Sequence, residues 1–381
     1  MKKIVIIGAN EFQNPLILKA KEMGFETHVF AWRDGAVGEK SADFFYPISI
    51  VEKEKILEQC KKIKPDAVTT IASDLAEITV NYLSNEMGLL ANSNKCIVAS
   101  TNKYEMRKTF DDAGVAVPRF CYADLETDLS TIRDAMNLPV IVKPTDRSGS
   151  RAITKLDNWD GLGQAIEGAV SESFEKKAII EEYLEGEEYS CECISFKGVH
   201  HFLAITKKFT TGNPHYIEIG HLQPSMLDDS VIERVKQVVF KALDALDIKN
   251  GASHSEFKVD ENGKVSIIEI GSRMGGDCIG SDLVPISTGY DFMKMVIQVA
   301  MGEKPVIVPE FSTKVAAIRF ILSKEELAHY CKLLERYPEK IYRTSEINAD
   351  YEHDVIDSSS RYGFYILKCD STEEALELAQ L

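Results

Sequence analysis

The first hundred residues alternate between strand-like apolar runs and helix-like segments, and this alternation restricts the possible folds more than any other feature. Strands are expected at 3–7, 27–30 and 67–71, and helices at 14–23, 52–62 and 75–86. Such alternation predicts a parallel sheet with helices on both faces. The opening strand is followed only by the first glycine of the G-x-G-x-x-G pattern, Gly8, so a dinucleotide site is not expected.

After residue 100 the pattern changes. A helix is expected over 102–112, and Gly114 and Pro118 end it, because glycine favours helix ends and the residue before proline is pushed towards extended geometry. Strands are then expected at 139–144, 178–182, 188–195, 201–207, 251–259 and 264–270. A helix is expected at 290–301, and a last segment runs from 313–322 through 362–366 to a helix from Thr372. The expected class is therefore α/β with an α+β core.

The two strands at 251–259 and 264–270 carry the clearest candidate site. The residues between them, Asp260-Glu261-Asn262-Gly263, are typical of a hairpin turn, and hairpin pairing would bring Glu256 and Glu269 side by side. Two aligned carboxylates repel unless a cation lies between them, and Mg²⁺ takes one or two carboxylates together with phosphate oxygens and water. His254 shares a strand face with Glu256 and either hydrogen-bonds this carboxylate or packs. The alternative is a pair of exposed acids on an ordinary hairpin.

Two further segments have the composition of nucleotide-binding loops. Lys143 ends an apolar strand and precedes 145–151, a turn with hydroxyls, two arginines and an unhindered backbone at Gly149. Such turns bind phosphate through backbone N–H groups, although no P-loop motif is present and a surface turn with a solvent-facing lysine is the alternative. Residues 179–189 have acids at both edges of an apolar centre, which suits a purine and its ribose, or else form a solvated acidic turn.

Charge and composition exclude several classes of function. The 381 residues carry a formal net charge of −16, and no basic run is present that could bind the phosphates of a nucleic acid. No apolar stretch approaches about 18 residues, so neither a membrane span nor a signal peptide is expected. The expected location is the cytoplasm. The eight scattered cysteines are expected to be free thiols, most of them buried.

Taken in order, these motifs resemble those of the ATP-grasp superfamily over nearly the whole chain. The resemblance implies an ATP-grasp fold with ATP between two antiparallel sheets. It also implies three parts: a nucleotide-like parallel-sheet α/β domain at 1–100, a small lid region at 101–186, and an antiparallel-sheet core with a terminal α/β subdomain at 187–381. Residues 216–225 and 275–277 look most like the L-amino-acid (dipeptide) ligase branch, and there is also resemblance to carbamoyl-phosphate-synthase-like and biotin-carboxylase-like chains.

The resemblance implies a role for each candidate residue. Glu256 and Glu269 match the magnesium ligands, and the catalytic residues would be Lys143 and Arg273, the latter steadying the transferred phosphoryl group. The ATP-binding residues would be Lys103, Lys143, Ser148, Gly149, Ser150, Glu181, Tyr183, Leu184 and Glu188, with 148–150 as a mobile loop over the phosphates. The candidate substrate residues are Glu77, Glu218, His221, Gly275 and Gly276.

One position departs from the family pattern. Many members have E-x-N-x-R, in which the asparagine is a further magnesium ligand, but position 271 is glycine here, so Ser272 or water would have to replace it. Glu77 follows the third strand, at the edge where open α/β sheets place ligands. Ser73 and Asp74, just before it, fit either a ligand site or a helix N-cap.

The implied activity is that of an ATP-dependent carboxylate–amine ligase. A carboxylate is too poor an electrophile for an amine, so ATP first converts it to an acylphosphate. The expected cofactors are ATP and Mg²⁺, with Mn²⁺ as an alternative, and the expected partners are a small carboxylate and an amine that is an amino acid. A homodimer would be ordinary for the family, and the span of the chain favours a stand-alone ligase over a synthase half. Two alternatives stay open: carbamoyl-phosphate-synthase-like or biotin-carboxylase-like activation of bicarbonate, and an ATP-binding regulatory protein without ligase turnover.

Overall fold

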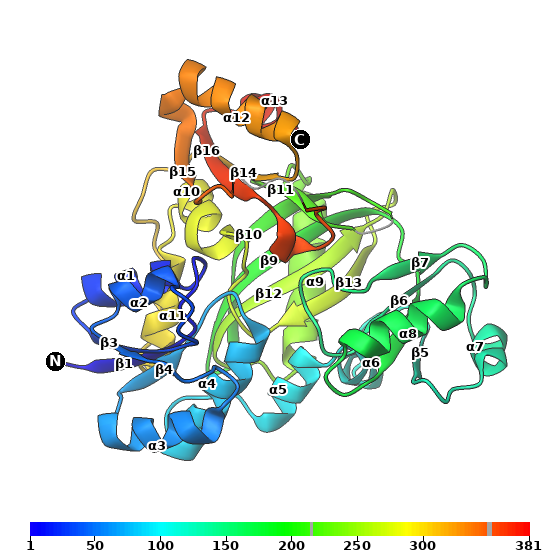
Figure 1. Cartoon of the computed structure of the whole chain (residues 1–381), viewed down its shortest axis with the longest axis horizontal. Coiled ribbons are helices and arrows are strands. Elements are labelled where there is room, and N and C mark those ends of the chain that lie inside the picture. Colours follow the sequence, from blue (N-terminus) through cyan, green and yellow to red (C-terminus); the bar gives the residue numbers. More distant parts are fainter. Residues whose placement is uncertain (214–215, 349–352) are drawn as a thin grey trace.

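The computed structural model describes residues 1–213, 216–348 and 353–381, whose strands form three sheets (Figure 1). The first sheet is parallel, with the order β3-β2-β1-β4. Its strands are β1 (Lys3–Ile7), β2 (Glu26–Phe30), β3 (Phe44–Tyr46) and β4 (Ala67–Thr69). The helices of this region are α1 (Asn14–Glu22), α2 (Val37–Ser41), α3 (Lys53–Ile63), α4 (Asp74–Met87) and α5 (Asn94–Thr101). The parallel sheet expected from the alternation is therefore confirmed.

Strand β1 shows why this sheet has helices on both faces. Successive side chains of a strand point to opposite faces. Ile4 and Ile6 pack in one core cluster with α1 and with α11 (Phe292–Ala300), whereas Val5 and Ile7 pack in another with α3 and α4. The continuous apolar run of β1 is the pattern of a strand buried on both faces.

The second sheet is antiparallel and forms the centre of the molecule (Figure 1). Its order is β13-β12-β9-β10-β11-β14-β16-β15. The strands are β9 (Glu187–Phe196), β10 (Val199–Thr210), β11 (Glu218–Gln223), β12 (Gly251–Val259), β13 (Val265–Gly271), β14 (Val315–Ile321), β15 (Ile341–Thr344) and β16 (Gly363–Cys369). The accompanying helices are α9 (Asp229–Ala245), η1 (Ile279–Leu283), α10 (Val284–Thr288), α11, α12 (Lys324–Arg336), η2 (Pro338–Lys340), η3 (Ser358–Ser360) and α13 (Thr372–Ala379).

The third sheet is also antiparallel and lies at the right of Figure 1, opposite the first sheet. Its strands follow the order β5-β8-β6-β7. Its elements are β5 (Phe120–Ala123), α7 (Leu129–Ala135), β6 (Val140–Pro144), β7 (Thr154–Leu156), α8 (Leu162–Glu172) and β8 (Ala178–Glu182). Helix α6 (Lys103–Asp112) leads into it and contacts both β5 and α9. The mixed architecture with a parallel N-terminal sheet and antiparallel sheets thus agrees with the expected fold class.

Two expectations from composition can be compared with the described residues. All eight cysteines are free, and six of them are buried, as expected. Within the described ranges, no helix combines the length and the apolar character that a membrane span requires.

Candidate functional site

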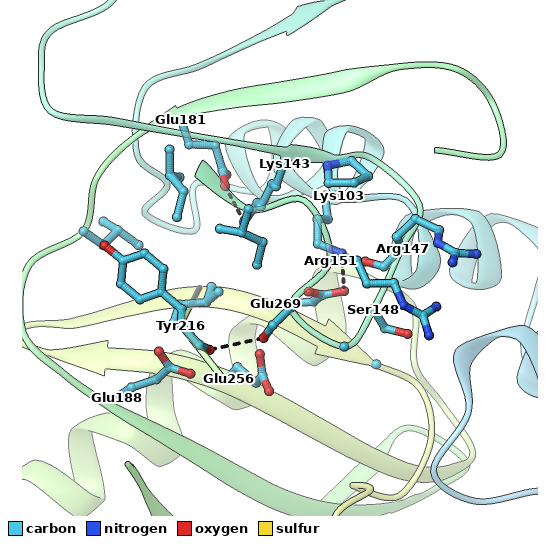
Figure 2. A pocket seen from close by; sticks show the side chains of 18 of the residues that line it. Lys103, Lys143, Arg147, Ser148, Arg151, Glu181, Glu188, Tyr216, Glu256 and Glu269 are labelled. Atoms are coloured by element: carbon cyan, nitrogen blue, oxygen red, sulfur yellow. Dashed lines mark hydrogen bonds and ion pairs between the residues drawn. The ribbon is translucent and has the colours of Figure 1, made fainter. Parts of the chain in front are cut away.

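A cavity lies between the third sheet and the eight-stranded sheet (Figure 2). Helix α6, the end of β6, the 147–151 loop and the end of β8 contribute to one side, while β9, β12 and β13 contribute to the other. Every residue that the sequence predicted for ATP, for the metal or for catalysis lines it: Lys103, Lys143, Ser148, Gly149, Ser150, Glu181, Tyr183, Leu184, Glu188, Glu256, Glu269 and Arg273. Positions spread over some 170 residues of sequence thus converge on one cavity.

The two predicted metal ligands are cross-strand neighbours. Strands β12 and β13 pair in the register that places Glu256 opposite Glu269, with a register shift directly after Glu256. Each carboxylate is held by a lysine: Lys208 Nζ lies 2.5 Å from Glu256, and Lys103 Nζ lies 2.9 Å from Glu269. No group of three His, Cys, Asp or Glu side chains in the described part of the chain is arranged to hold a metal. Two carboxylates still fit Mg²⁺ that is also bound by phosphate oxygens.

The lysine of β6 is part of a buried charge cluster. Lys143 Nζ lies 2.5 Å from Glu181, and the guanidinium of Arg107 also pairs with this carboxylate. Burial lowers the pKa of Lys143, although Glu181 opposes the shift. Burial would raise the pKa of Glu181, but Arg107 and Lys143 lower it to about 2. Two cations therefore face a single carboxylate at the end of strand β6.

Lys208 pairs with three glutamates of the site, and the sequence interpretation did not include it. Its ammonium lies 2.5 Å from Glu256, 3.3 Å from Glu188 and 3.6 Å from Glu218. Burial raises the pKa of Glu188, and the carboxylates of Glu256 and Glu218 add to the rise. Strand alternation offered a signal, because Thr206 and Lys208 share one buried face of β10.

His254 hydrogen-bonds the predicted metal ligand, which is one of the two interpretations of its position. Its Nε2 lies 3.2 Å from Glu256, and its Nδ1 bonds Glu192, which is fully buried. Glu192 also accepts a hydrogen bond of 3.0 Å from Gly275 N. Burial would lower the pKa of His254, but the carboxylates of Glu192 and Glu256 raise it to about 9. Hydrogen bonds of Glu192 and His254 thus connect β9, β12 and the segment after β13 next to Glu256.

At the opposite end the cavity has an aromatic and apolar lining. Lys258 donates hydrogen bonds to the carbonyl of Leu184 (2.9 Å) and to the hydroxyl of Tyr183 (3.0 Å), and its ammonium lies 4.2 Å from the centroid of the Tyr183 ring. Tyr216 lines the same end and is separated from the Arg147 and Arg151 side chains in Figure 2. Tyr216 belongs to the 216–225 segment that resembles the substrate-facing part of the ligase branch. Lys258 was not predicted to belong to the site, and it could have been found from its position two residues after Glu256 on one strand face.

Arg273 is held by a residue from the first sheet region. Asp74, the first residue of α4, accepts hydrogen bonds from Arg273 Nε (2.8 Å) and Nη2 (2.9 Å). Burial would raise the pKa of Asp74, but Arg273 lowers it. Ser73 caps α4 by accepting a hydrogen bond from Ala76 N, which is the helix N-cap of the two sequence interpretations.

The same ion pair explains the glycine at position 271. A Cβ atom there would lie 2.9 Å from Asp74 Oδ1 and 3.3 Å from the guanidinium of Arg273. The space of a side chain is thus already taken by the Asp74 carboxylate. Ser272, the alternative third ligand, is 4% exposed and its Oγ lies 3.0 Å from that of Ser100, outside the described lining of the cavity.

The predicted substrate residues are spread over several places. Glu218 lines the cavity described above, whereas Glu77, His221, Gly275 and Gly276 are not among its described lining residues. Glu77 lines a separate small cavity between α4 and α11, and burial raises its pKa to about 8. His221 is buried against Asp277, with Nε2 at 3.6 Å from the carboxylate, and burial lowers its pKa.

Comparisons with known proteins agree with this geometry. Residues 136–281 match the ATP-grasp domain family. The chain is 24% identical over 301 residues to alanine–anticapsin ligase of Bacillus subtilis (strain 168), covering 71% of this chain and 63% of that protein. It is 25% identical over 343 residues to the carbamoyl phosphate synthase large chain of Thermotoga neapolitana, covering 82% of this chain and 30% of that protein. The matches therefore span less than two thirds of either relative.

A solved structure matches over the full length. The crystal structure of L-amino acid ligase from Bacillus licheniformis has a TM-score of 0.82 at 22% identity, covering 100% of this chain and 96% of that one. A likeness at this identity establishes the fold but not the substrates. The chain therefore has the ATP-grasp fold, and its residues 136–281 match the ATP-grasp domain family.

Proposed function

We propose that the protein is an ATP-dependent carboxylate–amine ligase that uses Mg-ATP and joins an acid to an amine, one of them an amino acid. The observation that carries the proposal is the pairing of Glu256 with Glu269 opposite Lys103 and Lys143 in one cavity. Two carboxylates would hold Mg²⁺, and the lysines would hold the phosphates that share it. The similarity to an alanine–anticapsin ligase and to the fold of an L-amino acid ligase supports this class of reaction.

The reaction follows from the charges of the cavity. An oxygen of the substrate carboxylate forms a bond to the γ-phosphorus of ATP while the bond to the β,γ-bridging oxygen breaks, giving an acylphosphate and ADP. The amine nitrogen then attacks the acyl carbon, phosphate leaves with the acyl C–O bond electrons, and the amine loses a proton. Bound Mg²⁺ supplies charge neutralisation on the phosphates. Lys103, Lys143 and Arg273 position the γ-phosphoryl group and stabilise its charge.

The 148–150 loop would close over the phosphates and exclude water from the acylphosphate. Gly149 has φ of +80° and Ser150 has φ of +56°, so the loop turns sharply at two consecutive residues with positive φ. Ser150 Oγ donates a hydrogen bond of 3.3 Å to Tyr216 O, which links the loop to the eight-stranded side of the cavity. Within the 101–186 segment proposed as a lid, this loop joins β6 and β7.

Bicarbonate activation is the second candidate, because carbamoyl phosphate synthase matches 82% of the chain. The two candidates differ in the acid that triggers release of ADP from Mg-ATP. We expect ADP and phosphate to be released when an amino acid is supplied with an amine, and product mass to show a new amide bond. ADP release that needs only bicarbonate would favour the second candidate, and tight ATP binding without release in a broad acid and amine panel would favour a binding protein.

A further inference from the structure

A second cavity adjoins the phosphate end of the ATP cavity. Its volume is about 320 Å³, which is within the range of small-molecule sites. It shares six lining residues with the ATP cavity: Asp74, Lys103, Arg147, Ser148, Arg151 and Glu269. The remaining lining comes mainly from α4, α5 and Phe174. The two cavities therefore meet where the γ-phosphate of ATP is proposed to lie.

The acids of this second cavity already have partners. Asp74 pairs with Arg273, and Glu269 pairs with Lys103. Asp146 accepts hydrogen bonds from the backbone N–H groups of Phe174 (3.0 Å) and Glu175 (2.9 Å). None of these three carboxylates is therefore available to neutralise the arginines that line the same cavity.

Those arginines are only weakly paired. Arg147 has one ion pair of 3.5 Å with Glu172, and within the described residues its buried Nε has no hydrogen-bond partner. Arg151 Nε lies 3.7 Å from Asp357, a carboxylate that also accepts hydrogen bonds from two backbone N–H groups. Figure 2 shows both side chains on the side of the view away from Tyr216. The cavity lining thus contains two guanidinium groups whose ion pairs are long, 3.5 Å and 3.7 Å.

Another part of the lining of this cavity is apolar. Leu75 and Ile78 from α4, Val98 from α5 and Phe174 line it. Val98 is 53% exposed and Phe174 is 57% exposed. A ligand that covers these apolar side chains removes them from water, which is favourable. The guanidinium of Arg147 lies 4.5 Å from the centroid of the Phe174 ring, which joins the apolar wall to the cationic one.

We propose that this cavity binds the acid substrate, and that this acid is an amino acid or other small carboxylic acid with an apolar side chain. The inference rests on the proposed ligase function and deepens it. The carboxylate lies towards Arg147, Arg151 and the γ-phosphate, and the side chain packs against Ile78 and Val98. Discrimination comes from the apolar wall, since burial of the methylene groups of an apolar side chain is favourable.

Binding of L-leucine, with L-serine as the polar comparison, tests the inference without turnover. Ligand-observed NMR titrations are made with the full chain, Mg²⁺ and a non-hydrolysable ATP analogue. We expect the parent protein to bind L-leucine more tightly than L-serine. We expect Val98→Asp to weaken L-leucine binding about tenfold or more, while its affinity for the ATP analogue stays within about twofold of that of the parent protein. Val199→Asp is the matched control, because Val199 is 58% exposed and is not among the described lining of either cavity.

Three results would overturn the inference. The first is equal affinity of the parent protein for L-leucine and L-serine. The second is an affinity for L-leucine that Val98→Asp leaves unchanged. The third is an Arg151→Gln variant that loses affinity for the ATP analogue alone, which would assign the arginine to the nucleotide. Absence of acid-dependent ADP release in the parent would instead reject the ligase proposal, and the binding titrations would remain readable.

Discussion

Asp74 and Arg273 form a two-hydrogen-bond ion pair that joins the start of α4 to the segment after β13, 199 residues further along the chain. Arg273 was predicted to steady the transferred phosphoryl group, and the structure shows that its guanidinium is oriented by a carboxylate from the first sheet region. The N-terminal α/β region thus contributes directly to the geometry of the cavity.

Asp74→Asn should lower turnover more than nucleotide binding. The variant loses a charge-assisted pair, so we expect the free energy of unfolding to fall by about 2 kcal/mol and kcat to fall by about tenfold or more as Arg273 loses its orientation. Arg273→Ala should likewise spare ATP binding more than acyl transfer. Asp229→Asn, which also removes the charge of the first residue of a helix, is the control. An unchanged kcat in Asp74→Asn would show that the ion pair does not position Arg273.

A double-mutant cycle tests the explanation for Gly271. Gly271→Ala places a Cβ 2.9 Å from the Asp74 carboxylate, so the substitution should destabilise the protein. In the Asp74→Ala background that clash disappears. We therefore expect a coupling free energy of about 1–2 kcal/mol from urea denaturation of the four proteins. Strictly additive effects would mean that Asp74 does not occupy the space above Gly271.

Glu77 should make stability depend on pH. Burial raises its pKa from 4.5 to about 8, with a further contribution from the Asp74 carboxylate. Between about pH 5 and 8 the folded chain therefore binds more protons at this site than the unfolded chain, and this contribution to stability falls as pH rises through that window. Glu77→Gln should remove the fall. Parallel curves of unfolding free energy against pH for parent and variant would contradict the assignment.

The buried Glu192 should affect metal affinity through His254. Glu192→Gln weakens the hold on the imidazole that bonds Glu256, and loss of such outer partners costs about 10–100-fold in metal affinity. We expect the Mg²⁺ concentration for half-maximal binding of a fluorescent ATP analogue to rise by about tenfold. Glu187→Gln, on the same strand and paired with Lys207, should leave it unchanged. Equal Mg²⁺ dependence in both variants would remove Glu192 from the metal site.

Local patterns predicted much of the fold and of the nucleotide site. Strand β1 was expected with its observed bounds, and the hairpin turn at 260–263 predicted that the strands of Glu256 and Glu269 pair, while a register shift after Glu256 completes the alignment of the two residues. Both depend on residues that are close in the sequence. The resemblance added Lys103 and Arg273, whose positions in the cavity no local pattern determines.

The elements and residues that were missed depend on distant partners. Helix α9 was not predicted, because its Val and Ile residues also suit strands, although its buried residues Val235, Val239, Ala242 and Leu243 recur at helical spacing. Lys208 was missed because a lysine in a strand is ordinarily exposed, and its burial depends on three glutamates brought together by β9, β11 and β12. Asp74 was interpreted locally, whereas its partner lies after β13.

Release of ADP from Mg-ATP, measured with and without the acid and amine panel in the parent and in Glu269→Ala, tests the central claim most directly. Glu269→Ala removes one of the two proposed metal ligands and the partner of Lys103. We predict ADP release by the parent only when a carboxylic acid is present, and none by a folded Glu269→Ala protein. Near-normal, acid-dependent ADP release by Glu269→Ala would contradict the assignment of this carboxylate pair to the metal of an ATP site.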